Sequence, residues 1–212
     1  MLTPRFSRAP HYTPQRLSAL TLCLLLATNS ACARPGGKDY FPLSQGARWE
    51  YTGRVTSPRA QFDAPATIRV EGETIVRGRR YFKYVIESDL SAMPAGPRRS
   101  QEVRYYRVAQ DGIYYLPGKD TGGEEVLEMP LPIPTGVKWL SGSAEVTAER
   151  AGAVKAGGRE YADCLKITYK GADGSRGAEN YLAPGVGLVR AVLPGVFGPD
   201  STLELTLVNY QL

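Results

Sequence analysis

Paired carboxylates are the one catalytic set that the sequence offers beyond its first residues. Glu71 and Glu73 stand two positions apart, and Glu124, Glu125 and Glu128 follow one another closely. Carboxylates two positions apart on a strand face the same way and can share a proton, as general acid–base catalysis requires. The same spacing also arises on any solvent-facing strand, and we favour that interpretation.

The single histidine, His11, lies in the N-terminal leader. Once the leader is removed, the chain cannot build a Ser-His-Asp or Cys-His triad, nor a zinc or haem site with histidine ligands. The run Gly171–Gly174 lacks the alternating oxygen ligands of a calcium loop. We therefore expect a protein that is not an enzyme and that uses no cofactor and no metal.

Residues 1–31 are predicted to be a signal peptide. Three arginines and no acid come first, and the apolar run Leu17–Thr28 follows. That run is shorter than the roughly 20 residues that cross a bilayer, so we expect export rather than a membrane-spanning anchor.

Cys32 is the predicted site of lipid attachment, because Ser30–Cys32 looks like the end of a bacterial lipobox. Asn29 stands where the lipobox pattern prefers leucine, and cleavage after Ala33 is the alternative, which would discard the cysteine. Acylation would tie the protein to a membrane through its N-terminus. Cys164 then remains without an internal disulfide partner, and we interpret it as an inert strand residue.

The net charge of +5 comes partly from the leader. Without its three arginines, 23 basic residues face 21 acidic ones, and no basic stripe remains, so we expect no nucleic-acid partner. The chain has 42% hydrophobic residues, 23 glycines, 16 prolines and 13 tyrosines, which is typical of a globular all-β protein with many turns.

An internal duplication is the main architectural prediction. The nine-residue motif that ends in Trp49 recurs 90 residues later as the motif that ends in Trp139. Gly78 likewise matches Gly158, at a spacing of 80 residues. Gly112 and Gly187 match at a spacing of 75. Alternating apolar and polar residues predict strands in both copies.

We therefore expect a curved antiparallel sheet, of half-barrel or sandwich-like type, built from two repeated β units. A tether would span 32–40, and a single β domain 41–212. The domain would contain repeat one at about 41–116, repeat two at about 131–190 and a C-terminal strand at 201–212. Both tryptophans should lie in equivalent core positions, the segment 57–65 should be a loop, and the phase change after Leu207 should be a bulge.

Four tyrosines are the candidate contacts for a ligand or partner. Tyr105 and Tyr106 precede the Asp-Gly hairpin turn, and Tyr114 and Tyr115 follow it, so each face of the hairpin should receive one tyrosine from each strand. A sheet with apolar residues on both faces needs a cover on both or lines a groove, which could take a lipid, a peptide or another subunit. Ordinary packing is the alternative.

The opening Tyr40–Leu43, Gly46, Trp49 and Tyr51, together with the closing Ala183–Val189, resembles a group of bacterial envelope proteins of unknown function, often lipoproteins. The resemblance implies a half-barrel sheet, a place in the cell envelope (outer membrane or periplasm) and no catalytic residues.

Two functional hypotheses remain open. The first is an envelope lipoprotein that binds an amphipathic ligand or a protein partner through the curved sheet, with an apolar groove open to solvent. The second is a structural accessory protein with a closed core, which acts through the loops 94–99 and 194–200 and exposes Phe197.

Overall fold

The computed structural model describes residues 37–93, 96–117, 123–171 and 177–212. Within them the chain is almost all strand after one short 3-10 helix, η1. The elements are η1 (Gly37–Tyr40), β1 (Arg48–Thr56), β2 (Gln61–Asp63), β3 (Ala66–Val76), β4 (Arg79–Asp89), β5 (Arg99–Val108), β6 (Gly112–Leu116), β7 (Val126–Pro130), β8 (Lys138–Ser141), β9 (Ala144–Ala156), β10 (Arg159–Lys170), β11 (Ala178–Ala183), β12 (Gly187–Pro194) and β13 (Thr202–Gln211). In the described ranges no helix has the length and apolar character needed to cross a membrane.

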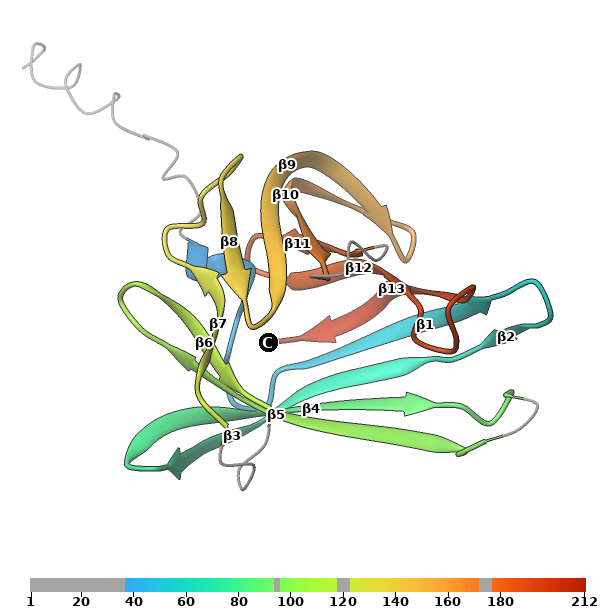
Figure 1. The fold of residues 1–212 in the computed structure, drawn as a ribbon, viewed down its shortest axis with the longest axis horizontal. Coiled ribbons are helices and arrows are strands. Elements are labelled where there is room, and N and C mark those ends of the chain that lie inside the picture. The colour runs from blue at the N-terminus through green and yellow to red at the C-terminus, as the bar shows by residue number, and fades with distance from the viewer. Residues whose placement is uncertain (1–36, 94–95, 118–122, 172–176) are drawn as a thin grey trace, which may run out of the picture. The chain divides into compact units, whose positions relative to one another are not determined.

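The strands form one antiparallel sheet in the order β7-β6-β5-β4-β3-β1-β13-β12-β11-β10-β9-β8, while the short β2 pairs with β1 alone. This order consists of two six-stranded meanders, β1 with β3 to β7 and then β8 to β13, joined where β1 pairs with β13. Figure 1 shows the strands of the first meander below those of the second. The sheet is curved and nearly closes on itself. A single curved antiparallel sheet with almost no helix confirms the predicted all-β fold class.

The matched glycines take matched places in the two meanders. Gly112 begins β6 and Gly187 begins β12, while Gly78 and Gly158 each lie in the turn before the third strand of their meander, with φ of 74° and 78°. The strand order is therefore the one that a duplicated β unit predicts.

The predicted bulge after Leu207 is confirmed. Tyr51 pairs with Leu207 and Glu50 pairs with Asn209, so Val208 is the extra residue of β13. Its side chain is 42% exposed, whereas Leu207 is fully buried. The phase change in the sequence thus marks a bulge on the strand that joins the two meanders.

Two boundaries differ from the sequence predictions. The segment 57–65 is not wholly a loop, because Gln61–Asp63 pairs with the end of β1 as β2. Tyr40, placed in the tether, is only 6% exposed, and its hydroxyl donates a hydrogen bond to the Asp163 carbonyl at 2.8 Å. Its ring is large enough to contribute to the core, so the packed domain begins before residue 41.

Three groups of buried side chains stabilise the sheet. The largest lies between the two meanders and includes Trp49, Tyr51 and Leu207. A second surrounds Tyr106, Ile113 and Ile167, also inside the curve. A small third one, around Tyr81 and Tyr105, covers the outer face of the first meander. We call the face that carries the first two groups the inner face.

Candidate functional site

The four candidate tyrosines divide between the two faces of the sheet as predicted. Tyr106 is paired with Tyr115 across β5 and β6, so both side chains lie on the inner face. Tyr105 is opposite Leu116, and Tyr114 is opposite Arg107, which puts these two tyrosines on the outer face. The structure therefore does not bring all four tyrosines into one surface.

The inner pair belongs to an aromatic cluster. The Tyr106 ring centroid lies 4.8 Å from that of Phe41, 5.1 Å from that of Tyr84 and 5.8 Å from that of Tyr115. These are the spacings of packed aromatic rings. Burial, together with the nearby Glu128 carboxylate, raises the pKa of Tyr106 well above its ordinary value, so its hydroxyl stays neutral.

The outer pair is held by local contacts. Tyr105 is 8% exposed and packs beside Tyr81 and Leu116. The Tyr114 hydroxyl donates to Asp111 at 2.8 Å, and the Arg107 guanidinium lies 4.8 Å from the Tyr114 ring centroid. Both tyrosines are thus accounted for by packing and hydrogen bonding within the hairpin.

Glu125 is the centre of an ion network on the outer face. Arg107 donates to both of its carboxylate oxygens, at 2.6 and 2.8 Å, and Tyr81 donates to one of them at 2.6 Å. Arg79 adds a contact at 2.7 Å. The hydrogen bonds from Arg107, reinforced by Tyr81, lower the pKa of Glu125 to about 2 despite its partial burial.

Glu128 has a different environment, which the sequence did not reveal. It is 9% exposed, and its carboxylate accepts hydrogen bonds from the Tyr169 hydroxyl at 2.8 Å and from Ser141 at 3.4 Å. The indole N–H of Trp139 donates to the Glu128 backbone carbonyl at 3.2 Å. These contacts link the edge strand β7 to β8 and β10. No local pattern could have predicted them, because all three partners follow Glu128 in the chain by 11 or more residues.

The carboxylate pairs do not form a shared-proton site. Glu125 and Glu128 have different partners, as described above. Glu71 forms ion pairs with Arg69 and with Lys83, whereas Glu73 pairs with Arg80 at 3.3 Å. Gly72 lies at a register shift between them, which separates their surroundings. Among the residues that the structure describes, no group of three or more potential metal ligands comes together.

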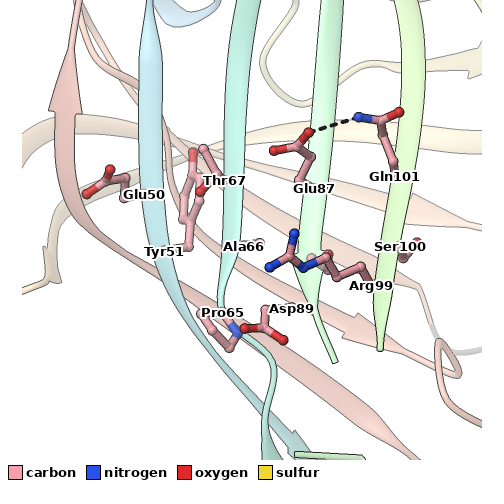
Figure 2. A pocket seen from close by; sticks show the side chains of 11 residues that line it. Glu50, Tyr51, Pro65, Ala66, Thr67, Glu87, Asp89, Arg99, Ser100 and Gln101 are labelled. Carbon is pink, nitrogen blue, oxygen red and sulfur yellow. Dashed lines mark hydrogen bonds between the residues drawn. The ribbon is translucent and has the colours of Figure 1, made fainter. Parts of the chain in front are cut away.

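A groove of about 610 Å³, lined mostly by residues of polar type, crosses β1, β3, β4 and β5. Figure 2 shows Glu50, Thr67, Glu87 and Gln101 in a row across the strands. Arg69 and Gln101 donate to Glu87, at 3.0 and 2.8 Å, and these hydrogen bonds lower the pKa of its carboxyl. The Glu87 carboxylate is therefore held by a guanidinium group on the neighbouring strand β3, as is common on a solvated face.

The inner face of β4 is less well covered than that of β3. Ile68 and Val70 of β3 are 4% and 1% exposed, yet Ile86 and Tyr84, their partners on β4, are only half-buried. The next residues across, on β5, are polar.

Glu102 pairs with Ile86, and Arg104 pairs with Tyr84. The Arg104 guanidinium lies 5.6 Å from the Tyr115 ring centroid, and its side chain remains 32% exposed. We call Tyr84, Ile86, Glu102 and Arg104 the inner strip. In this strip the half-buried side chains of Tyr84 and Ile86 on β4 lie next to the charged side chains of Glu102 and Arg104 on β5.

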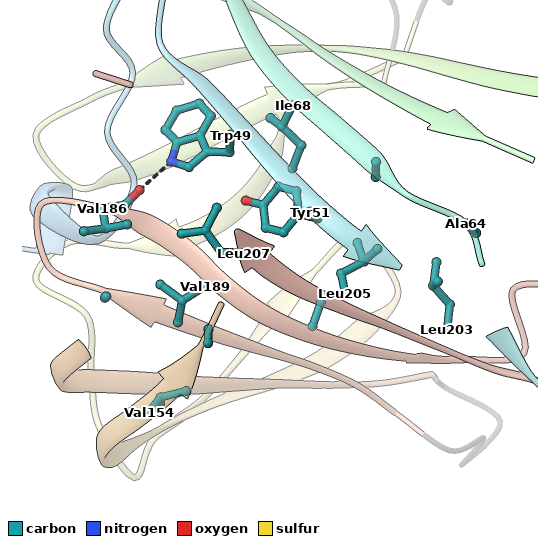
Figure 3. Packing of buried hydrophobic residues seen from close by; sticks show 14 of the residues in the cluster. Trp49, Tyr51, Ala64, Ile68, Val154, Val186, Val189, Leu203, Leu205 and Leu207 are labelled. Carbon is teal, nitrogen blue, oxygen red and sulfur yellow. Dashed lines mark hydrogen bonds between the residues drawn. The ribbon is translucent and has the colours of Figure 1, made fainter. Parts of the chain in front are cut away.

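The two tryptophans are both first-strand residues, but they differ in burial. Trp49 of β1 is 3% exposed, and its indole N–H donates to the Val186 carbonyl at 2.6 Å (Figure 3). Trp139 of β8 is only half-buried. The prediction of equivalent core positions is therefore correct for Trp49 and wrong for Trp139, because β8 is an edge strand with a neighbour on one side alone.

Cys164 and Phe197 complete the predicted residues within the described ranges. Cys164 is 1% exposed, and burial raises the pKa of its thiol, so an inert strand residue is the correct interpretation. Phe197 is half-buried, with its ring centroid 5.6 Å from that of Phe62 in an edge-on arrangement. It is not the exposed side chain that the closed-core hypothesis expects. Cys32 lies outside the described residues, as do Pro94 and Ala95.

No protein-family model matches the sequence, and no curated protein matches it. Several solved structures are similar in fold. A protein from Bacteroides fragilis described as exported, with a YMCC-like fold, is 12% identical and matches over 81% of this chain and 98% of its own, with a TM-score of 0.41.

A protein from Parabacteroides distasonis described as a lipoprotein is 10% identical, over the same shares of the two chains and with the same TM-score, 0.41. A LolA superfamily protein from Nitrosomonas europaea is 8% identical, over 83% of this chain and 89% of its own, with a TM-score of 0.32.

Proposed function

We propose that the protein is a non-catalytic binding protein of the bacterial cell envelope, which holds an amphipathic ligand against the inner strip. The observation that carries the proposal is the drop in coverage from β3 to β4. Ile68 is 4% exposed, but its partner Ile86 is only half-buried and is followed by the charged Glu102. An apolar strip that is left partly open inside a curved sheet is a typical place for an apolar ligand.

The strip also suits a polar head group. Arg104 donates to Glu102 at 2.5 Å and lies 3.4 Å from the Tyr106 hydroxyl. The two opposite charges are partly exposed, with side chains at 32% and 50%. A zwitterionic or hydrogen-bonding head would meet these groups while its apolar part covers Tyr84 and Ile86.

Binding of a dansyl-labelled fatty acid, followed by its fluorescence, tests this function. We expect saturable binding with a blue-shifted emission, and the variant Ile86→Glu should weaken it by about tenfold or more, because it puts a charge on the apolar strip. The matched control is Leu140→Glu, at a side chain that is 66% exposed on β8, which should bind as the wild type does. A wild-type protein that does not bind the probe, or two variants with equal affinity, would contradict the proposal and favour the closed-core accessory protein.

We further propose that the mature protein is exported and carries its lipid on Cys32. The arginine-rich leader, the short apolar run and the small residues before Cys32 support this proposal. Mass spectrometry of the protein extracted from membranes should find an acylated N-terminal Cys32, and the variant Cys32→Ser should appear in the soluble fraction. An unmodified N-terminus at Arg34 would show cleavage after Ala33 instead.

A further inference from the structure

The hairpins β3–β4 and β9–β10 turn with the same backbone. Arg77 and Gly78 have φ of 51° and 74°, and Gly157 and Gly158 have φ of 55° and 78°. Two successive residues with positive φ are typical of a type I′ turn. The two turns are 80 residues apart in the sequence, so they are corresponding points of the two copies.

Their surroundings differ. The β9–β10 turn packs on β13, since a Cβ atom on Gly157 would lie 2.2 Å from the Leu207 backbone oxygen. Gly78 and its counterpart Gly158 both have open space around a Cβ, whereas Arg77, the counterpart of Gly157, is exposed and donates a hydrogen bond to the Gly123 carbonyl at 2.8 Å. The β9–β10 turn therefore contacts β13 through the backbone at Gly157, whereas the β3–β4 turn is held by a side-chain hydrogen bond from Arg77.

The β3–β4 tip carries an unusual combination of side chains. Ile75 is 69% exposed, more than any other large hydrophobic side chain in the described ranges, and its cross-strand partner is Arg80, which is 73% exposed. Arg79 is 62% exposed, whereas its partner Glu125 is only 15% exposed. Arg80 also pairs with Glu73, whose side chain is 44% exposed, at 3.3 Å. The tip thus presents one aliphatic side chain near three guanidinium groups and two carboxylates, which leaves a net positive charge.

The second copy lacks this combination. Eighty residues on, Ile75 becomes Lys155, Arg77 becomes Gly157 and Arg80 becomes Glu160. The backbone turn does not require Ile75, Arg77 or Arg80, since the second hairpin makes the same turn with other residues there and keeps only Arg79, as Arg159. The presence of Ile75, Arg77 and Arg80 on the β3–β4 tip alone therefore needs another explanation.

We infer that the β3–β4 tip, formed by Ile75, Arg77, Arg79 and Arg80, docks on an anionic phospholipid surface. Guanidinium groups bind phosphate oxygens, and an aliphatic side chain among them can enter the boundary between head groups and acyl chains. A protein partner fits less well, because a stable interface buries about 800 Å² on each side, and the tip of one hairpin offers little flat surface. The inference is independent of a ligand at the inner strip and of acylation at Cys32.

Vesicle flotation tests the inference with the chain that begins at Ala33, which contains every described strand and has no acyl group. We expect binding to phosphatidylglycerol vesicles that weakens with added salt, and little binding to phosphatidylcholine vesicles. Ile75→Ser should weaken the binding about tenfold, and Arg77→Gly about fivefold. Arg77→Gly recreates the Gly-Gly turn of the second hairpin, so it should leave the fold unchanged.

Lys155→Ser is the matched control, because it changes the corresponding residue of the packed hairpin; it should bind as the wild type does. Circular dichroism of each variant should match that of the wild type. Failure of the wild type to float with phosphatidylglycerol vesicles would overturn the inference, as would variants at Ile75 and Arg77 that bind as well as it does. Binding to polyglutamate but not to vesicles would also overturn it, in favour of an acidic protein partner.

Discussion

The indole N–H of Trp49 donates a hydrogen bond of 2.6 Å to the carbonyl of Val186, 137 residues further along the chain. Trp49 belongs to the opening motif of the sequence, and Val186 to its closing motif. A second bond runs in parallel, from the Tyr51 hydroxyl to the Leu188 carbonyl at 2.9 Å. The two motifs that carry the resemblance to envelope proteins therefore form one structural unit, in which aromatic side chains of β1 satisfy backbone carbonyls at the start of β12.

Trp49→Ala should destabilise the protein by about 3–5 kcal/mol, because it removes a buried ring and leaves the Val186 carbonyl without its donor. Trp139→Ala should cost less, about 1–2 kcal/mol, since that ring is half-buried on an edge strand. Urea unfolding followed by circular dichroism measures both. Equal losses would show that edge position does not lower the contribution of Trp139.

Gly157→Ala should be the more damaging of two glycine replacements in matching hairpins. The Cβ of an alanine at this position would lie 2.2 Å from a backbone oxygen of β13, and the residue would also have to adopt a positive φ. We therefore expect the free energy of unfolding to fall by about 3 kcal/mol or more. Gly78→Ala meets no atom within 4 Å and should cost only the backbone term, about 1–2 kcal/mol. The pair of unfolding free energies tests whether the β9–β10 tip packs on β13, and a smaller loss for Gly157→Ala would argue against that contact.

The ion network of Glu125 predicts a pH dependence with a definite sign. Since the folded-state pKa is about 2, below the ordinary value of 4.5, the network stabilises the protein fully above about pH 4.5 and loses its effect as the pH falls toward 2. Glu125→Gln should therefore cost about 2 kcal/mol at pH 7, and its difference from the wild type should shrink in acid.

Urea titrations at several pH values give this difference directly. Glu73→Gln is the control, because its partner Arg80 is 73% exposed and such pairs contribute about 0–1 kcal/mol. A deficit of Glu125→Gln that stayed constant from pH 7 to pH 3 would mean that the carboxyl is not held ionised by Arg107.

Cys164 should react slowly with thiol reagents in the native protein. The side chain is 1% exposed and burial raises the pKa of the thiol, so little thiolate is available. Labelling with iodoacetamide should become fast only in denaturant. Rapid labelling under native conditions would show that β10 opens readily at this position.

Local patterns predicted much of the fold, because neighbouring strands are also neighbours in the sequence. The Asp111-Gly112 turn and the alternation in β1 and β9 each depend on a few adjacent residues, and the structure confirms the hairpins that they predict. The three-residue β2 was missed, since so short a strand has too few positions to show alternation.

The inner site was harder to predict, since its environment depends on contacts between distant residues. Glu128 looks like one member of an acidic run, yet its partners Ser141 and Tyr169 come from two other strands. The partial burial of Ile86 likewise depends on its neighbours Ile68 and Glu102, which belong to β3 and β5. Neither property is encoded in the residues next to these positions.

The pairing of β1 with β13 has a consequence for how this chain can be rearranged. Arg48, at the start of β1, is opposite Gln211, at the end of β13. The start of the first strand in the sequence therefore lies beside the end of the last one. The gap in the ladder lies elsewhere, between β7 and β8, which follow one another in sequence. A circular permutant that joins the old ends and opens the chain between β7 and β8 would exchange the order of the two halves while every strand keeps its neighbours.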